Sequence, residues 1–261
     1  MKNDRLKSIL GIPYFLFLVI FVVCPVLILL YYAFTNGSGE FSLANFTLFF
    51  TDSKAIGTLI YSAMVAVVTT IVCLLIAYPV AYLLAKGEFR RGNVLLMLFV
   101  MPMWINFTLR ITALKEILTL IEGNLAFHPF LNTVIGMTYD FLPFMILTIY
   151  NTIAKIDHSY IEAAKDLGAK SYRVFLRVIL PLSIPGIISG ITMVFLPSMT
   201  NYVVLDMMYN STYIMGSLVG SYFSMYDWNN GSVISMILLI LILLLSTITG
   251  EFPDKEDNAY E

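Results

Sequence analysis

The feature that most constrains this chain is a series of six apolar runs, each near the length that crosses a lipid bilayer as a helix. A crossing helix needs about 20 predominantly apolar residues. The chain is 59% hydrophobic and only 12% charged, whereas soluble domains are about 25% charged. Because so few polar side chains are available to cover a surface in water, we expect an all-α protein that crosses a membrane several times. The runs lie at 12–34, 57–85, 93–114, 131–154, 180–205 and 231–250.

Basic residues are distributed unevenly between the two sides of this predicted bundle. Three of the 15 Lys and Arg residues, Lys54, Arg110 and Lys115, fall on one side, and all the others fall on the opposite side. Loops rich in Lys and Arg remain in the cytoplasm, so both termini are predicted to be cytoplasmic. The predicted organisation is an N-terminal segment, a transmembrane domain and an acidic tail, at 1–11, 12–250 and 251–261.

The longest predicted cytoplasmic segment, 155–180, has the marks of a compact helix. Ser159 and Glu162 stand at the spacing of a capping box, in which the hydroxyl accepts from one backbone amide and the carboxylate reaches back to another. Two alanines that favour helix follow, and Gly168 can adopt the left-handed conformation that ends a helix. A second helix is predicted to start with Ser171 as its cap. The segment is therefore predicted to form a helix–glycine–helix elbow along the inner membrane surface.

Two charged residues fall within or beside the apolar runs, where a charge is costly and therefore informative. At a rise of 1.5 Å per residue on unbroken helices, Asp140 lies about 22 Å outward from Lys155, and Arg110 lies about 25 Å outward from Asn93. These similar depths predict one of two roles. Either the two residues form a structural ion pair, or Asp140 faces a path and offers a counter-charge to a cation. Arg110 has a third possibility, which is to extend to the outer surface.

The fifth apolar run contains Gly186, Gly190 and Pro197, which predict an interruption of its helix. Irregular backbone at membrane depth is tolerated where it lines a cavity or is buried in protein. Aromatic residues make up 14% of the chain, so packing or a position at the membrane surface is the alternative role for each of them. The residues predicted to line a substrate path are Trp104, Tyr139, Asp140, Ser198, Asn201 and Tyr202.

The elbow also carries a recognisable motif. Its residues Glu162-Ala163-Ala164-x3-Gly168-x9-Val178-x-Leu180-Pro181 resemble the EAA loop in membrane subunits of bacterial binding-protein-dependent ABC importers with the type I (MetI-like) fold. Val178 stands where isoleucine is usual in that loop. The chain is further similar to the spermidine/putrescine permeases, and among these to the B-type subunit. That similarity is carried by Tyr160–Ala169, Leu180–Ile187, Phe195–Tyr202 and Met101–Asn106 with Arg110.

The resemblance implies a fold of six transmembrane helices and a mechanism. The elbow is then a coupling helix that seats in a groove on a cytoplasmic ATPase dimer, whose closure on ATP rocks the transmembrane helices. A second permease subunit completes a heterodimer in the bacterial cell membrane, and an extracytoplasmic binding protein delivers the polyamine. Glu162 has the alternative of only capping its own helix. The implied coupling residues are Glu162, Ala163, Ala164, Leu167 and Gly168.

The residue types argue against several other functions. The sequence has no Gly-x4-Gly-Lys-Ser/Thr loop to hold nucleotide phosphates, and its two His and two Cys form no cluster suited to a metal. We therefore expect no cofactor, no metal, no nucleic-acid partner and no enzymatic activity. The alternatives are a permease of the same fold for ferric iron, sulfate or an opine, a surface helix that only holds the loop on the membrane, and a channel or sensor scaffold.

Overall fold

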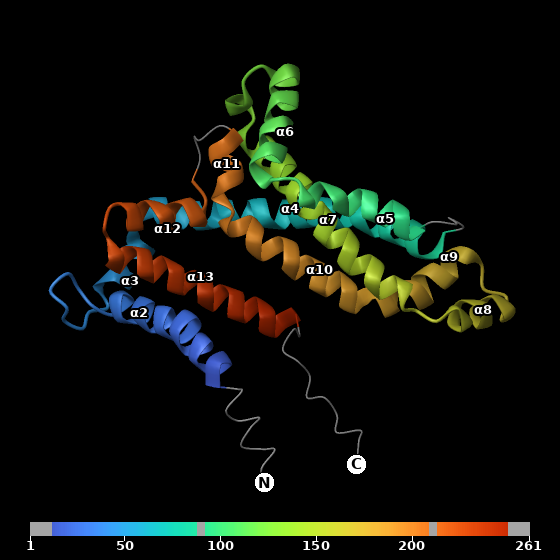
Figure 1. Cartoon of the computed structure of the whole chain (residues 1–261), viewed down its shortest axis with the longest axis horizontal. Coiled ribbons are helices and arrows are strands. Elements are labelled where there is room, and N and C mark those ends of the chain that lie inside the picture. The colour runs from blue at the N-terminus through green and yellow to red at the C-terminus, as the bar shows by residue number, and fades with distance from the viewer. Residues whose placement is uncertain (1–11, 88–91, 209–212, 250–261) are drawn as a thin grey trace, which may run out of the picture. The chain divides into compact units, whose positions relative to one another are not determined.

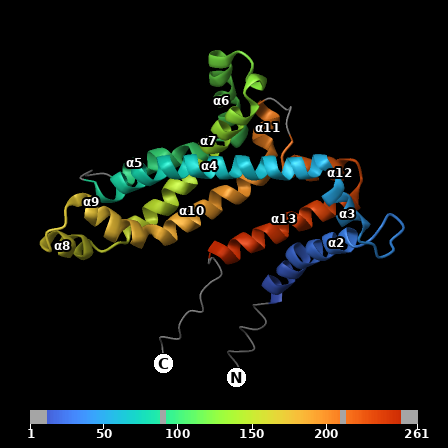
Figure 2. The ribbon, with the colours of Figure 1, turned by 180° about the vertical axis from the view of Figure 1, so that it is seen from behind.

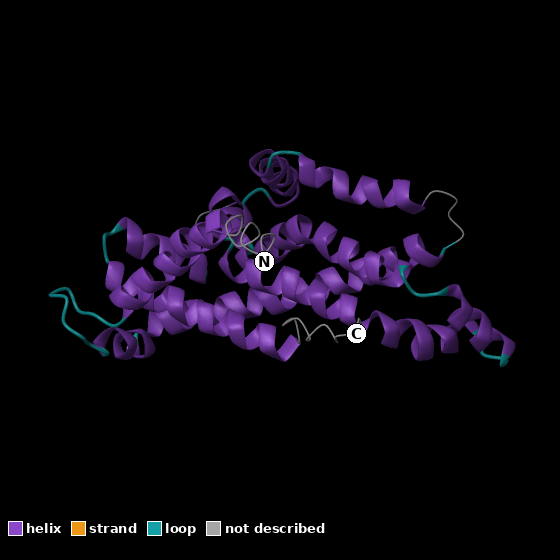
Figure 3. Ribbon diagram, turned by 60° about the horizontal axis from the view of Figure 1, so that its bottom comes forward, coloured by secondary structure: helices purple, strands orange, loops and turns teal. Residues whose placement is uncertain are grey.

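A computed structural model describes residues 12–87, 92–208 and 213–249. The predicted cytoplasmic N-terminus at 1–11, the acidic tail at 251–261 and the basic residues Arg90 and Arg91 lie outside these described residues. Helices make up almost all of the regular structure in the described ranges (Figure 3), apart from one isolated bridge between Thr35 and Phe41. The chain divides into two compact units, one formed by Met1–Thr58 with Ser217–Ile242 and the other by Leu59–Gly216 with Leu243–Glu261.

The first unit contains the N-terminal span and the helices at the other end of the chain. The span is helical from Ile12 to Ala33 and includes a π-helical turn, η1 (Val19–Val23), before α2 (Cys24–Ala33). The Asn229 side chain donates hydrogen bonds to the backbone oxygens of Tyr32 and Thr35, at 3.0 and 2.6 Å, and so joins two distant parts of the chain. The remaining helices of this unit are α3 (Ala44–Thr51), the start of α4 (Ser53–Lys86), α12 (Met215–Ser224) and most of α13 (Trp228–Thr249).

The second unit is built around α7 (Pro129–Ala154), the most buried of the candidate spans. Within its most apolar stretch 61% of α7 is buried, against 33% for α4 and 28% for the segment Ser171–Thr200. Helix α10 (Leu180–Thr200) runs beside α7 in both views of the chain (Figures 1 and 2). The other elements of this unit are α5 (Gly92–Val100), η2 (Met101–Trp104), α6 (Phe107–Glu122), η3 (Leu125–Phe127), α8 (His158–Asp166), α9 (Ser171–Val174), η4 (Phe175–Ile179) and α11 (Tyr202–Met208).

Glycines on α10 allow the close approach of α7 and α10. A Cβ added at Gly186 would overlap the Thr152 side chain, and one added at Gly190 would lie 3.3 Å from the Met145 sulfur. In lipid, small residues at helix interfaces are favoured because association depends on close van der Waals packing. The prediction that Gly186, Gly190 and Pro197 interrupt this helix is therefore wrong. Helix α10 continues to Thr200, and the break falls at Asn201.

The third apolar run is bent rather than straight. Val94–Trp104 and Phe107–Glu122 pass as one span by length and composition but meet at an angle of 97°. The chain is extended at Ile105, and the Asn106 side chain accepts a hydrogen bond from the amide of Thr108, which caps α6. The prediction of a continuous helix at 93–114 is wrong because this cap starts a new helix in a new direction.

Within the described residues, the six predicted spans correspond to five uninterrupted helices and this bent pair. The uninterrupted candidate spans are Ile12–Ala33, Ser53–Lys86, Pro129–Ala154, Ser171–Thr200 and Trp228–Thr247. None of the most apolar stretch of the first span is buried, so its side chains are available to lipid or to a partner.

A glycine-to-alanine comparison tests the packing of α7 on α10. Gly186→Ala is expected to destabilise the protein by about 1–3 kcal/mol, because overpacking moves neighbouring atoms. Gly57→Ala on α4 is the control, since nothing lies within 4 Å of a Cβ built there and alanine favours helix over glycine by about 1 kcal/mol. The measurement is the melting temperature in detergent. A Gly186→Ala protein that melts no lower than the Gly57→Ala protein would show that this contact is not tight.

Candidate functional site

The elbow begins with a cap that the sequence analysis placed wrongly. Helix α8 starts at His158, and the Asp157 carboxylate accepts a hydrogen bond of 2.9 Å from the amide of Ser159. This backbone hydrogen bond, more than any other contact, lowers the pKa of Asp157 below its usual value. The Glu162 carboxylate lies 3.2 Å from His158 Nδ1, so the expected Ser159–Glu162 capping box is wrong. Aspartate and serine are comparable helix caps, and Asp157 precedes Ser159 in the chain.

The elbow turns at Gly168 as the sequence predicted. Gly168 has φ +80°, the left-handed region that glycine enters at little cost. Its amide donates to the Lys165 oxygen at 2.8 Å, and the Ala169 amide donates to the Ala164 oxygen at 3.0 Å. These two bonds form a Schellman motif, which satisfies carbonyl groups left open at the end of a helix. The turn is therefore held by hydrogen bonds on both sides.

Two contacts fasten the elbow to the transmembrane helices, one from α8 and one from the turn before it, and the sequence analysis missed both. Ile161 is only 6% exposed and joins the buried hydrophobic cluster of the second unit. Lys86, at the end of α4, donates from Nζ to the Ile156 oxygen at 2.7 Å. An isoleucine in the middle of a polar helix was the available signal for the first contact. The second has no sequence signal, because it joins residues 70 positions apart.

The outer surface of the elbow is left open. Leu167 is 90% exposed, although a large apolar side chain gains by burial. Glu162, Ala163 and Gly168 are also exposed, and Ala164 is half-buried against the cluster. A shallow cavity of about 250 Å³ lies beside Leu167 and Gly168 and includes Arg173 and Arg177 in its wall. An apolar tip flanked by guanidinium groups is suited to a protein partner, since interface cores favour apolar anchors and arginine.

The second arm of the elbow is the start of a transmembrane span. Helix α9 leads through the π-helical turn η4 into α10 as one candidate span, Ser171–Thr200. The expectation that Ser171 caps this arm is wrong, because the cap position is Lys170 and no side chain makes the cap hydrogen bond. The second arm of the elbow is therefore continuous with α10.

A second candidate site is a buried polar cluster in the same unit. Arg110 on α6 donates from a terminal nitrogen to Asp140 Oδ1 on α7 at 2.8 Å, and both side chains are 8% exposed. Asn201, at the break between α10 and α11, donates from Nδ2 to Asp140 Oδ2 at 3.3 Å. The Arg110 guanidinium carbon lies 5.9 Å from the centroid of the Tyr139 ring. Four residues that the sequence nominated thus meet at one point.

The ion pair determines what this cluster can offer to a ligand. Arg110 offsets the charge of Asp140, so the cluster presents no net charge unless the pair opens. Within the described residues, Nε and Nη1 of Arg110 are buried without a hydrogen-bond partner. An incompletely bonded buried charge is costly, which makes this pair a candidate point of rearrangement.

The other residues predicted for the path are placed differently. Ser198 is fully buried, and its hydroxyl donates to the Val194 oxygen of its own helix at 2.6 Å. Trp104 and Tyr202 are 80% and 39% exposed. In the described part of the chain, neither aromatic ring makes a hydrogen bond or a ring contact with the cluster.

Comparison with known proteins identifies the class of this chain. A family model described as "Binding-protein-dependent transport system inner membrane component" matches residues 77–250. This match covers well over half of the chain. The chain belongs to that family of transport permeases.

Relatives in three bacteria carry a more specific name. The chain is 34% identical to the "Spermidine/putrescine transport system permease protein PotB" of Haemophilus influenzae, over 93% of this chain and 92% of that protein. Identity to PotB of Escherichia coli is 32%, over 87% and 90% of the two chains. A PotB homolog of Mycoplasma pneumoniae is 30% identical, over 85% and 80%.

Solved structures support the fold. A bacterial ABC transporter for alginate matches with a TM-score of 0.71 over 97% of this chain and 98% of that chain, at 14% identity. The MetNI methionine ABC transporter matches with a TM-score of 0.60 over 77% and 97%, at 17% identity. The predicted all-α, polytopic, type I importer permease fold is confirmed.

The ion pair leads to a stability prediction. Arg110→Met is expected to cost about 3–5 kcal/mol, because it leaves the Asp140 carboxylate buried and unpaired. The double variant Arg110→Met/Asp140→Leu is expected to recover most of that loss, since an apolar pair replaces a desolvated ion pair at little cost. The measurement is the fraction of monodisperse protein after heating in detergent. Equal losses in the single and double variants would contradict energetic coupling between the two side chains.

Proposed function

We propose that this chain is a membrane-spanning subunit of an ATP-driven importer for a polyamine, spermidine or putrescine. The names of the relatives support the substrate class, since PotB proteins at 32–34% identity are called spermidine/putrescine permeases. The single observation that carries the proposal is the elbow. It is an exposed helix with a fixed beginning, a fixed end and an unburied leucine at its tip.

The elbow has the mechanical properties that coupling to a motor needs. A short helix transmits force better when its ends do not fray, and here the Asp157 cap stabilises one end and the Gly168 turn stabilises the other. Ile161 and the bond from Lys86 tie the helix to the bundle. A pull on Leu167 is therefore passed to α4 and α10. The proposed source of that pull is a separate ATPase dimer, with this chain as a non-catalytic subunit.

The proposed arrangement in the membrane follows the charge distribution. The elbow and its neighbours carry Lys86, Lys155 and Lys165, and the positive-inside rule favours a cytoplasmic location for such loops. Both termini then lie on the same, cytoplasmic side of a bacterial cell membrane. A second permease subunit would complete the pathway, and a binding protein would deliver substrate from the opposite side. One solved structural relative is an alginate transporter in complex with its periplasmic protein.

The proposed path lies beside the buried polar cluster. Tyr139 and Tyr202 offer partly exposed aromatic faces, and Trp104 offers a largely exposed one. A cation over such a face gains about 0.5–2 kcal/mol. Asn201 and Asp140 supply oxygen atoms, and opening of the Arg110 pair would free the carboxylate for an ammonium group. Ser198 is proposed only as a packing residue of this region, because its hydroxyl is already bonded within its helix.

The coupling role has a specific test at the elbow tip. Leu167→Ser is expected to weaken ATPase association at least about fivefold, because the loss of a central apolar anchor costs more than about 1 kcal/mol. Met225→Ser, in a turn where the side chain is 75% exposed, is the control. The measurement is ATPase co-purification together with uptake. Unchanged assembly of the Leu167→Ser complex, or labelling of residue 165 from outside the cell, would contradict the coupling role.

The substrate class is tested by uptake into vesicles that contain the whole complex. Labelled spermidine or putrescine is expected to accumulate only when ATP is present on the side of the membrane that carries the ATPase. Excess unlabelled polyamine should compete, whereas ferric iron, sulfate and opines should not. Competition by one of those solutes but not by a polyamine would reject the polyamine as substrate and would leave the protein as an importer permease for that other solute. Uphill transport by this chain alone would reject the importer proposal.

A further inference from the structure

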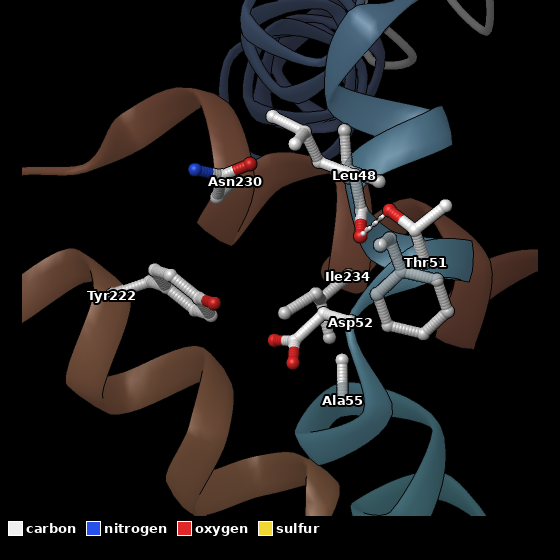
Figure 4. Close-up of a pocket in the computed structure, with 9 residues that line it drawn as sticks. Leu48, Thr51, Asp52, Ala55, Tyr222, Asn230 and Ile234 are labelled. Atoms are coloured by element: carbon white, nitrogen blue, oxygen red, sulfur yellow. Dashed lines mark hydrogen bonds between the residues drawn. The ribbon is translucent and has the colours of Figure 1, made fainter.

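A cavity of about 390 Å³ lies in the first unit, apart from both candidate sites in the second. It is formed where α3 ends and α4 begins, and by α12 and the first turns of α13 (Figure 4). Its volume falls within the range of about 300–1,000 Å³ that is usual for small-molecule sites. Its wall includes Phe49 and Ile234, and its polar residues are Thr51, Asp52, Tyr222 and Asn230.

Two oxygen-bearing groups face each other across this cavity. In Figure 4 the Asp52 carboxylate and the Tyr222 phenol oxygen point toward one another. Asp52 Oδ1 accepts from the amide of Lys54 at 2.9 Å and so caps α4, but a carboxylate has about four acceptor positions. Within the described residues no hydrogen bond joins Asp52 to Tyr222. The space between them therefore suits a group that donates hydrogen bonds to both.

The electrostatic environment of the cavity is negative. Burial raises the pKa of the Tyr222 phenol, and the carboxylates of Asp52 and Asp227 raise it further. No basic side chain is among the described residues that line the cavity. Lys54 is the nearest basic residue in the sequence, and its backbone amide donates the capping hydrogen bond to Asp52. Asp227 does not line the cavity, and its oxygens accept from the amide and side chain of Asn230, at 3.2 and 2.8 Å.

We propose that this cavity binds the ammonium end of a short alkylamine. An ammonium group has three donors, and the Asp52 carboxylate, the Tyr222 oxygen and the oxygens of Thr51 or Asn230 supply acceptors for them. The methylene groups of the ligand then pack on Phe49 and Ile234. Asp140 in the buried cluster is already paired with Arg110. The Asp52 carboxylate, in contrast, lies among aromatic and apolar residues, and no basic side chain is among the described residues that line the cavity.

The identity of the amine rests on the proposed function: if the chain transports a polyamine, the bound ammonium group is one end of that polyamine. In the proposed topology the cavity opens on the extracytoplasmic side, because it lies at the start of α4, whereas Lys86 at the end of α4 is bonded to the proposed cytoplasmic elbow. A subsite there would hold substrate after its release by the binding protein and before it reaches the aromatic residues of the path.

A thiol placed on the cavity wall tests this inference. Thr51→Cys is introduced into the full complex with Cys24→Ser and Cys73→Ala, and the complex is placed in phosphatidylglycerol nanodiscs. Its reaction rates with a cationic and an anionic methanethiosulfonate reagent are normalised to a free thiol. One nearby carboxylate is expected to favour the cationic reagent by about fivefold. Putrescine is expected to slow the reaction in a saturable manner.

Matched variants distinguish the contribution of the Asp52 carboxylate, which lines the cavity, from that of Asp227, which does not. Asp52→Asn preserves the helix cap, since asparagine and aspartate are comparable caps. It is expected to abolish the protection and to lower the charge preference to the level that the anionic lipid alone produces. Tyr222→Phe should weaken protection while the charge preference remains. Asp227→Asn, the same change outside the lining, should leave protection by putrescine in place.

The outcomes distinguish failure of this inference from failure of the proposed function. Polyamine uptake by the complex without protection of the thiol would overturn the cavity site and leave the transport function standing. Protection without polyamine uptake would support the site and reject the transported substrate. A preference for the anionic reagent would overturn the inference. So would protection by added phosphatidylethanolamine but not by putrescine.

Discussion

The structure depends on one constraint, which is that a backbone in lipid must form its hydrogen bonds within the protein. Continuous helices meet this constraint along most of each span, and polar side chains gather where a helix stops. Asn106 caps the new helix after the 97° bend, and Asn201 stands at the break after α10. Arg110 and Asp140 meet Asn201 at that second break. Breaks in a helix cost free energy in lipid, and here they are also where the residues of the proposed path are concentrated.

Sequence patterns predicted the elements and the clustered residues better than the positions of the breaks. Apolar runs specify the spans because length in a bilayer is fixed. The Arg110–Asp140 pair is one of the alternatives that two charges of similar depth left open, and the structure contains it. The bend before Asn106 was missed because a cap inside an apolar run does not lower its hydrophobicity. Gly186 and Gly190 were taken for helix breakers, but in lipid a glycine on a helix face more often serves a neighbouring helix.

The elbow shows the same limit in another form. Its turn at Gly168 was predictable from local rules, because a Schellman motif needs only nearby residues. Its attachment was not, since the bond from Lys86 to the Ile156 oxygen depends on the tertiary fold. The cavity near Asp52 and Tyr222 was also beyond the sequence. Its residues come from two distant segments, and Asp52, the acid among its described lining residues, caps a helix and so does not suggest a ligand by itself.

The left-handed turn at Gly168 has a genetic consequence. Every missense change of one base in a glycine codon adds a Cβ atom, and in the left-handed region that atom costs about 1–2 kcal/mol. Aspartate is the single-base replacement best tolerated in that conformation, but it places a carboxylate on the face proposed to meet the ATPase. Asparagine, which fits the geometry without the charge, requires two base changes. No single-base missense change at this codon is therefore free of a backbone cost, and purifying selection is expected to act on each of its missense variants.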